Sequence, residues 1–136
     1  MAVVTSSQAI GRHLLYLASD AFKGKLTRAL MQEAIEQIDA GFASSRDPYG
    51  QRWQPLKVRR GQPLRDTGRL QRSFSGSSDP NGFKVGTDVV YANVHQFGYR
   101  PKRIPARPML PDGTLGVIWT RALEAAAQRV ADLEAP

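Results

Sequence analysis

The sequence predicts an α+β fold with a long N-terminal helical region, a small antiparallel β-sheet with extended loops, and a C-terminal amphipathic helix. Apolar residues recur at helical spacing over residues 6–43 and again over residues 115–133. Between these runs, two segments rich in small, β-branched and aromatic residues flank a turn at residues 79–82. Because 136 residues can bury only one modest core, we expect a single domain over residues 1–136.

The N-terminal region contains an unbroken row of apolar residues at i, i+4 spacing. Such a row drifts slowly round a helix of about 3.6 residues per turn, so a continuous helix would present apolar side chains to more than one partner. Gly24 lowers helix propensity, which leaves open whether one bent helix or two helices form. The row consists of Ile10, Leu14, Ala18, Phe22, Leu26, Leu30, Ala34, Ile38 and Phe42.

A tight turn follows the helical region. Asp47, Pro48 and Gly50 occupy positions that a type I turn favours, because Asp accepts backbone hydrogen bonds, Pro presets φ and Gly tolerates the exit. Trp53 comes shortly after the turn, and an indole offers the largest apolar surface in this chain. We therefore expect Trp53 to be a structural anchor that fastens the following loop to the core.

The basic loop after Trp53 leads into a β-hairpin. Asp66 or Thr67 can cap a short helix over residues 69–73. Residues 79–82 then repeat the pattern of Asp, Pro and Gly, so their flanks are expected to pair as antiparallel strands. Prolines confine residues 103–110 to a sheet edge or to irregular structure.

The C-terminal run predicts an amphipathic helix, because its apolar residues share one face. That face consists of Leu115, Ile118, Trp119, Ala122, Leu123, Ala126, Val130 and Leu133.

The net charge of +7 comes from the middle of the chain. Residues 46–107 hold thirteen Lys or Arg against four Asp or Glu, whereas residues 1–45 are neutral and residues 108–136 carry a net −2. Such a field suits nucleic acid or an acidic protein surface. A small basic nucleic-acid-binding module is therefore one reading of the sequence. Against it, neither predicted helical region is basic, and the charge lies in loops.

The composition also limits the cellular context. The chain has no cysteine, so it offers no disulfide, thiolate metal site or thiol nucleophile. Its N-terminus lacks the basic start and apolar run of a secretory signal, and no stretch of about 18 apolar residues occurs. We expect a soluble protein made in the cytoplasm, without a membrane partner.

The sequence shows no catalytic constellation. His13 and His95 are its only imidazole bases, and His13 lies on the predicted helix beside the apolar row. His95 is better placed, yet a packing or hydrogen-bonding role is favoured over catalysis. Metal-ligand spacings and phosphate-binding loops are absent. We therefore expect no enzyme, no metal and no cofactor, and a hydrolase that uses His95 is the remote alternative.

Four motifs, in this order and spacing, carry a resemblance to a known family. They are "RDPYGQRWQPL", "PLRDTGRLQRSF", "VGTDVVYANVHQFG" and "IPARPMLP", followed by the C-terminal helix. From about Phe42 to its end, the chain resembles the Mu-type phage virion morphogenesis family, the tail-completion proteins of tailed phages and prophages. The resemblance implies a non-enzymatic structural protein of the virion. It would act at the phage neck or tail end, completing the tail or joining head to tail as a ring.

The resemblance implies partners of three kinds: further copies of the chain, other neck, connector or tail-tube proteins, and DNA that passes through the ring without sequence-specific contact. Such a protein would form in the host cytoplasm and end in the virion. Tyr91, Val94 and Phe97 are expected to tuck a short turn into the sheet, and Tyr91, His95 and Phe97 are expected to be structural anchors. The following proline-stiffened segment is expected to be an arm that docks on a neighbour, because prolines reduce the entropy lost on docking. The alternative for its apolar half is an ordinary loop that closes back on its own domain through Ile104 and Met109. The expected interface cations are Arg59, Arg60, Arg65, Arg100, Lys102, Arg103 and Arg107.

Overall fold

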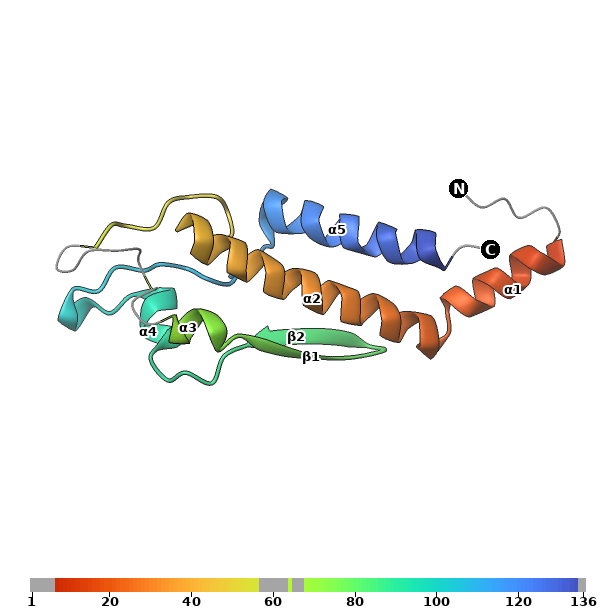
Figure 1. Ribbon diagram of the computed structural model, residues 1–136, viewed down its shortest axis with the longest axis horizontal. Coiled ribbons are helices and arrows are strands. Elements are labelled where there is room, and N and C mark those ends of the chain that lie inside the picture. The colour runs from red at the N-terminus through yellow and green to blue at the C-terminus, as the bar shows by residue number, and fades with distance from the viewer. Residues whose placement is uncertain (1–6, 57–63, 65–67, 135–136) are drawn as a thin grey trace.

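Figure 1 shows a computed structural model of the chain, which describes residues 7–56, 64 and 68–134. Its elements are helix α1 (Ser7–Leu17), helix α2 (Asp20–Ser44), helix α3 (Arg69–Arg72), strands β1 (Ser75–Asp79) and β2 (Gly82–Gly86), helix α4 (Ala92–Phe97), the 3-10 helix η1 (Arg100–Lys102) and helix α5 (Gly116–Leu133). The α+β class, the N-terminal helical region, the small antiparallel sheet and the C-terminal helix are confirmed. The expected cap of the short helix at Asp66 or Thr67 lies outside the described residues.

The long helix α2 is the middle layer of the fold (Figure 1). Helix α5 runs along one side of it, and the β1–β2 hairpin lies along the other. Helix α1 leaves at one end, while α3, α4 and η1 gather at the opposite end. Ile38 and Phe42 of α2 are the largest fully buried side chains, so the core lies where α2 meets its two neighbouring layers.

The helical run divides at Ser19 and not at Gly24. Ser19 has an extended backbone, and its hydroxyl accepts a hydrogen bond from the Phe22 backbone N–H at 3.3 Å, which caps α2. Gly24 lies inside α2 with open space around its Cα. A glycine in a helix interior costs only about 1 kcal/mol, which a helix of this length tolerates.

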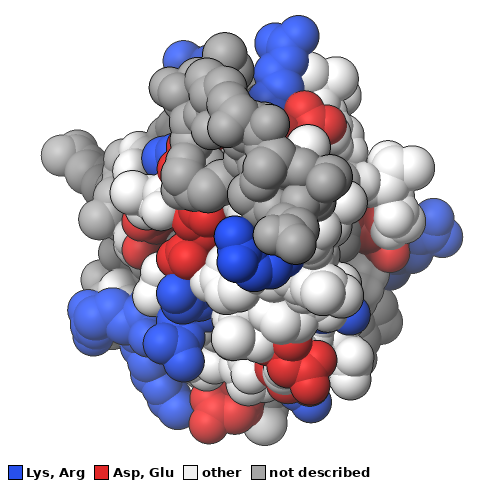
Figure 2. All heavy atoms as spheres, turned by 90° about the vertical axis from the view of Figure 1, so that its right-hand side faces the viewer, with Lys and Arg blue, Asp and Glu red and all other residues white. Residues whose placement is uncertain are grey.

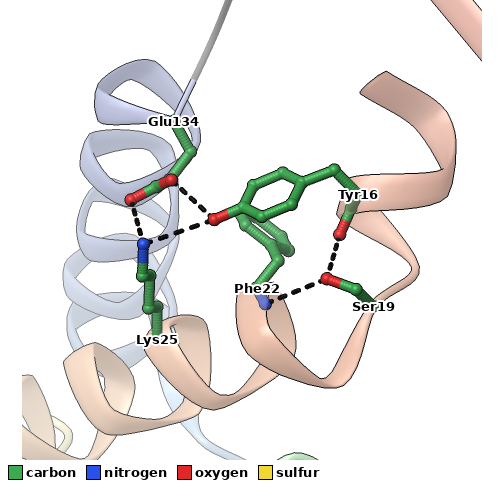
Figure 3. Close-up of polar contacts among 5 residues, drawn as sticks. All are labelled: Tyr16, Ser19, Phe22, Lys25 and Glu134. Atoms are coloured by element: carbon green, nitrogen blue, oxygen red, sulfur yellow. Dashed lines mark hydrogen bonds and ion pairs between the residues drawn. The ribbon is translucent and has the colours of Figure 1, made fainter. Parts of the chain in front are cut away.

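A polar cluster links α1 to α2 and to the end of α5 (Figure 3). The Tyr16 hydroxyl donates to Glu134 Oε2 at 2.6 Å, and Lys25 Nζ lies 3.0 Å from Glu134 Oε1. These contacts join α1, α2 and the end of α5. The hydrogen bond from Tyr16 and then that from Lys25 lower the pKa of Glu134, and Glu134 in turn raises the pKa of Lys25.

The side chain of Asp79 stabilises the turn of the β1–β2 hairpin. The Asp79 carboxylate accepts from the backbone N–H of Asn81 at 2.7 Å and of Gly82 at 3.1 Å. Thr27 Oγ1 of α2 donates to the Asp79 carbonyl at 2.7 Å, which ties the turn to the central helix. The hairpin is therefore held against α2 at its tip as well as along its length.

Two tryptophans complete the core. Trp53 is 6% exposed, and its ring meets Phe42 edge-on with centroids 5.4 Å apart. Trp119 brings α5 into the same cluster. The predicted α5 face is buried only in its middle, because Leu115, Ile118 and Leu133 at its two ends are exposed.

None of the helices in the described part of the chain combines the length and the hydropathy that a bilayer crossing requires.

Candidate assembly surface

Residues 91–112 form helix α4, a loop closed by paired backbone hydrogen bonds, and an extended segment that returns toward the core. Helix α4 is followed by a loop whose ends, Tyr99 and Ile104, exchange two backbone hydrogen bonds of 2.9 and 3.0 Å. Arg100, Lys102 and Arg103 lie in this loop and are exposed. We call these three residues the basic tip. Because the loop is closed by paired backbone bonds, its three cations are displayed at a fixed place at the end of the molecule opposite α1 (Figure 1).

The extended return, residues 104–112, is hydrogen-bonded to α4 through the side chain of Gln96. Gln96 Oε1 accepts from the backbone N–H of Met109 at 2.8 Å and of Leu110 at 3.1 Å, and its Nε2 donates to the Leu110 carbonyl at 2.8 Å. The amide thus satisfies backbone groups of the return that pair with no strand in the described part of the chain. Sequence reasoning missed Gln96, because a neutral amide in a short helix carries no pattern of its own.

Arg107 lies inside the fold, not on a partner surface. It is 7% exposed, and its guanidinium donates to the carbonyls of Gln54 at 2.8 Å and Pro55 at 3.2 Å. Its backbone N–H also donates to the His95 carbonyl at 2.7 Å. The expectation that Arg107 contacts a partner is therefore corrected, since this side chain supports the loop after Trp53 from within.

Two aromatic side chains hold the return from the other side. Trp53 Nε1 donates to the Pro108 carbonyl at 2.9 Å. The Tyr49 hydroxyl donates to the Thr114 carbonyl at 2.7 Å and accepts from the Asp112 N–H at 3.0 Å. Tyr49 is presented by the predicted turn, in which the Gly50 N–H donates to the Asp47 carbonyl at 3.0 Å. Three of the four motifs found in the sequence therefore meet in one hydrogen-bonded network.

His95 belongs to this network and has the features of a packing residue. Its ring is half-buried and meets Tyr91 edge-on, with centroids 5.8 Å apart. Nδ1 is buried without a hydrogen-bond partner among the described residues. Burial, and next the positive charge of Arg107, lower the pKa of His95 below its ordinary value of 6.5. A protonated His95 is thus disfavoured in the folded chain.

The lowered pKa of His95 predicts a loss of stability in acid. Below pH of about 6.5 the unfolded chain takes up a proton on His95 while the folded chain resists it, so the free energy of unfolding falls as pH decreases through that value. His95→Gln should make the midpoint of urea unfolding less dependent on pH between about 7 and 5. Equal slopes for the two proteins would contradict this assignment.

The surface beside the return is hollowed and carries two exposed apolar side chains. Val90 is 91% exposed and Phe97 is 64% exposed. Both line a cavity of about 440 Å³, whose wall includes Phe74, Val89 and Met109. We call the exposed pair Val90 and Phe97 the α4 patch. Exposed apolar side chains beside a hollow make this surface a candidate for protein contact.

The α4 patch corrects an expectation about anchoring. Phe97 does not tuck the segment into the sheet, because most of its side chain is exposed. Tyr91 is also exposed. The segment is held instead by Gln96 and by the buried Ala92. Aromatic content alone could not reveal this, since an aromatic residue of a short helix can face either the core or a partner.

The expected interface cations do not form one site. Arg59, Arg60 and Arg65 lie outside the described residues. The basic tip is exposed, whereas Arg107 is buried. Seen from the α1 end, positive and negative side chains are interspersed over the visible surface (Figure 2). In the part of the chain that the structure describes, no group of three or more His, Cys, Asp or Glu side chains could hold a metal ion.

Comparison with known proteins agrees with this description. The model of the phage virion morphogenesis family matches residues 7–131. The chain is 37% identical over 87 residues to the Mu-like prophage FluMu G protein 2 of Haemophilus influenzae, an alignment that covers 60% of this chain and 63% of that protein. It is 28% identical over 103 residues to an uncharacterized protein of Methanocaldococcus jannaschii, with 65% of this chain and 76% of that protein covered.

The chain thus spans somewhat less than two thirds of the FluMu protein's length. No solved structure gives a significant match. The family model, by contrast, covers nearly the whole chain, including the helical region and the network around the return. This chain belongs to the phage virion morphogenesis family.

Proposed function

We propose that this chain completes the phage tail or joins it to the head by forming a ring of identical subunits at the neck or tail end. The supporting observation is that the chain exposes apolar side chains on α1 and beside α4, and these two helices lie at opposite ends of the molecule (Figure 1). A ring requires two different contact faces on each subunit, which meet by a rotation that closes. An isolated subunit would leave both of these surfaces in water.

The first surface is a stripe on α1. Ile10, Leu14 and Leu15 are exposed, and Leu15 keeps 74% of its surface in water. Helix α1 is held to the other helices mainly near its end, by Tyr16 and its partners (Figure 3). An apolar helix face that its own fold leaves uncovered is a surface suited to a groove on another molecule.

The second surface is the α4 patch with its cavity. The Gln96 bonds and the paired bonds of the tip loop fix its shape before any partner arrives. A surface that is already ordered loses little conformational entropy on association. The basic tip next to it would contact an acidic surface of a connector or tail-tube protein, or the phosphates of passing DNA.

An alternative role as a nucleic-acid-binding module finds less support. The exposed cations of the basic tip lie on a loop rather than on a recognition helix. Binding to DNA should therefore be weak, independent of sequence and strongly reduced by salt.

The proposed ring can be tested with the purified chain. Native mass spectrometry and electron microscopy should show a closed oligomer with a central opening. Changing Val90 and Phe97 to Asn should yield monomers that keep their far-ultraviolet circular dichroism, since both side chains are exposed. The matched control changes the exposed helix residues Gln32 and Gln128 to Asn and should leave the oligomer intact. A chain that remains monomeric at all concentrations, alone and with tails, would overturn the ring.

A further inference from the structure

We propose that neighbouring copies of this chain join by strand addition, with the outer edge of β1 in one copy pairing with the outer edge of β2 in the next. The inference rests on the proposed ring and adds a contact between hairpins to those of the α1 stripe and the α4 patch. The hairpin is the only sheet in the described part of the chain, and its order is β1–β2. Each of its strands therefore has one neighbour and one open edge.

The register identifies the backbone groups at the open edges. Asp79 pairs with Gly82 across the two-residue turn, Ser77 with Lys84, and Ser75 with Gly86. Pairs that close such a turn, and every second pair beyond, exchange backbone hydrogen bonds inside the hairpin. The intervening pairs point their N–H and C=O groups outward. Those residues are Gly76 and Ser78 on β1, and Phe83 and Val85 on β2.

The outward backbone groups lack partners in the described part of the chain. No backbone hydrogen bond outside the hairpin reaches Gly76, Ser78, Phe83 or Val85. Few of the devices that normally protect an edge are present, because no proline lies within either strand and Lys84 is the one lysine in them. An open edge of this kind is a template for another strand.

The side chains at the two edges fit each other. A Cβ added to Gly76 would meet Met31 of α2 at 2.8 Å, so this residue and its cross-strand partner Val85 face the central helix. Alternation places Ser78 and Phe83 on the same face. If Val85 pairs with Gly76 of the next copy, and Phe83 with its Ser78, each large side chain meets a small one. The layer beneath α2 then continues from copy to copy without overpacking.

The spacing of the layers agrees with this join. Two strands occupy about 10 Å of sheet width, so successive hairpins repeat at about that interval. One helix, α2, covers each hairpin on this face. Packed helices lie about 8–10 Å apart, so the α2 helices of adjacent copies would come into contact at the distance the sheet imposes.

A second copy of this chain is the partner that best fits the two open strand edges. Adding β1 of one copy to β2 of another keeps every strand antiparallel to its neighbours, and the added copy again ends in an open β2 edge. The same join can therefore be repeated until a ring closes. The opposite face of the sheet carries Ser75, Ser77 and Lys84, all exposed, so it remains polar after assembly.

Disulfide trapping tests this contact, because the chain has no cysteine of its own. In the stated register, Lys84 of one copy lies opposite Ser77 of the next on the exposed face, with Cβ atoms about 5 Å apart. Ser77→Cys and Lys84→Cys are produced separately and also co-expressed, then oxidised and run on non-reducing gels. A dimer band is expected from the co-expressed sample alone. The single variants are the matched controls. In each of them the cysteines of adjacent copies lie two strands apart, which is too far for a disulfide.

The outcomes separate this inference from the proposed ring. A wild-type sample that forms a ring, with no dimer band in the mixed sample, would overturn the strand contact and leave the ring standing. A wild-type sample that forms no ring would overturn both. A dimer band that appears equally in a single variant would also contradict the stated pairing.

A proline variant provides an independent check. The Ser78 N–H points outward, so Ser78→Pro removes an edge donor while keeping the internal hydrogen bonds of the hairpin. We expect its monomer to melt near the wild-type temperature and its ring to dissociate at a protein concentration at least about tenfold higher. Ser78→Ala keeps the N–H and should assemble like the wild type. Rings of equal stability from the two variants would overturn the strand contact.

Discussion

Replacing Trp53 by alanine should lower the free energy of unfolding by about 3–5 kcal/mol, as is typical when a buried tryptophan is truncated. The ring is 6% exposed and packs edge-on against the fully buried Phe42. Its Nε1 also holds the return segment at Pro108. A small domain has a total stability of about 5–15 kcal/mol, so the variant should be partly unfolded or poorly soluble. Urea unfolding followed by circular dichroism measures the change.

Trp53→Phe is the matched control for this prediction. It keeps an aromatic ring against Phe42 and removes the donor to the Pro108 carbonyl. Its cost should be smaller than that of the alanine variant, because a lost hydrogen bond of this part-buried kind amounts to at most about 1–3 kcal/mol. An alanine variant as stable as the wild type would mean that the indole contributes nothing to the core.

Changing Arg100, Lys102 and Arg103 together to glutamate should abolish the joining of phage particles while leaving the fold intact. All three side chains are exposed at the tip, where charge changes usually alter stability by only about 0.5 kcal/mol. Like charges forced together at an interface cost several kcal/mol. We expect normal thermal unfolding of the purified variant. In a phage that lacks the wild-type gene, the variant should yield separate heads and tails.

The control for the tip reverses the same number of charges elsewhere. Lys23, Arg28 and Arg121 are exposed on α2 and α5, away from the tip. Their change to glutamate gives the same net charge, and joined particles should form. Infectious, correctly joined particles from the tip variant would show that the tip makes no essential contact, whereas failure of both variants would point to net charge alone.

The layered fold could be predicted from the sequence because its elements follow local patterns. The apolar rows over 6–43 and 115–133 and the turn at 79–82 are set by periodicity and turn chemistry. The position of the helix break was harder to predict from the sequence. Gly24 has the lower propensity, but Ser19 supplies a side-chain cap, and the capped position is the one at which the helices separate.

The assembly surface could be predicted only in part from the sequence, because it depends on contacts between residues far apart in the chain. Arg107 and the tip cations look alike in sequence, yet a bond to Gln54, which is 53 positions away, buries one of them. Trp53 and Phe97 are both aromatic, and tertiary packing alone places the first in the core and the second in water. Gln96 became recognisable only when the return segment was seen beside it.

Cryo-electron microscopy of assembled particles is the most direct test of the proposal that this family member is a ring at the neck or tail end. Particles of the phage that encodes the chain are compared with those of a mutant that lacks it. We expect wild-type particles to show a ring of this fold between the tail tube and the head, and the mutant to accumulate separate heads and tails without the ring. Density for the chain only inside the capsid or along the tail shaft, or joined infectious particles from the mutant, would contradict the account.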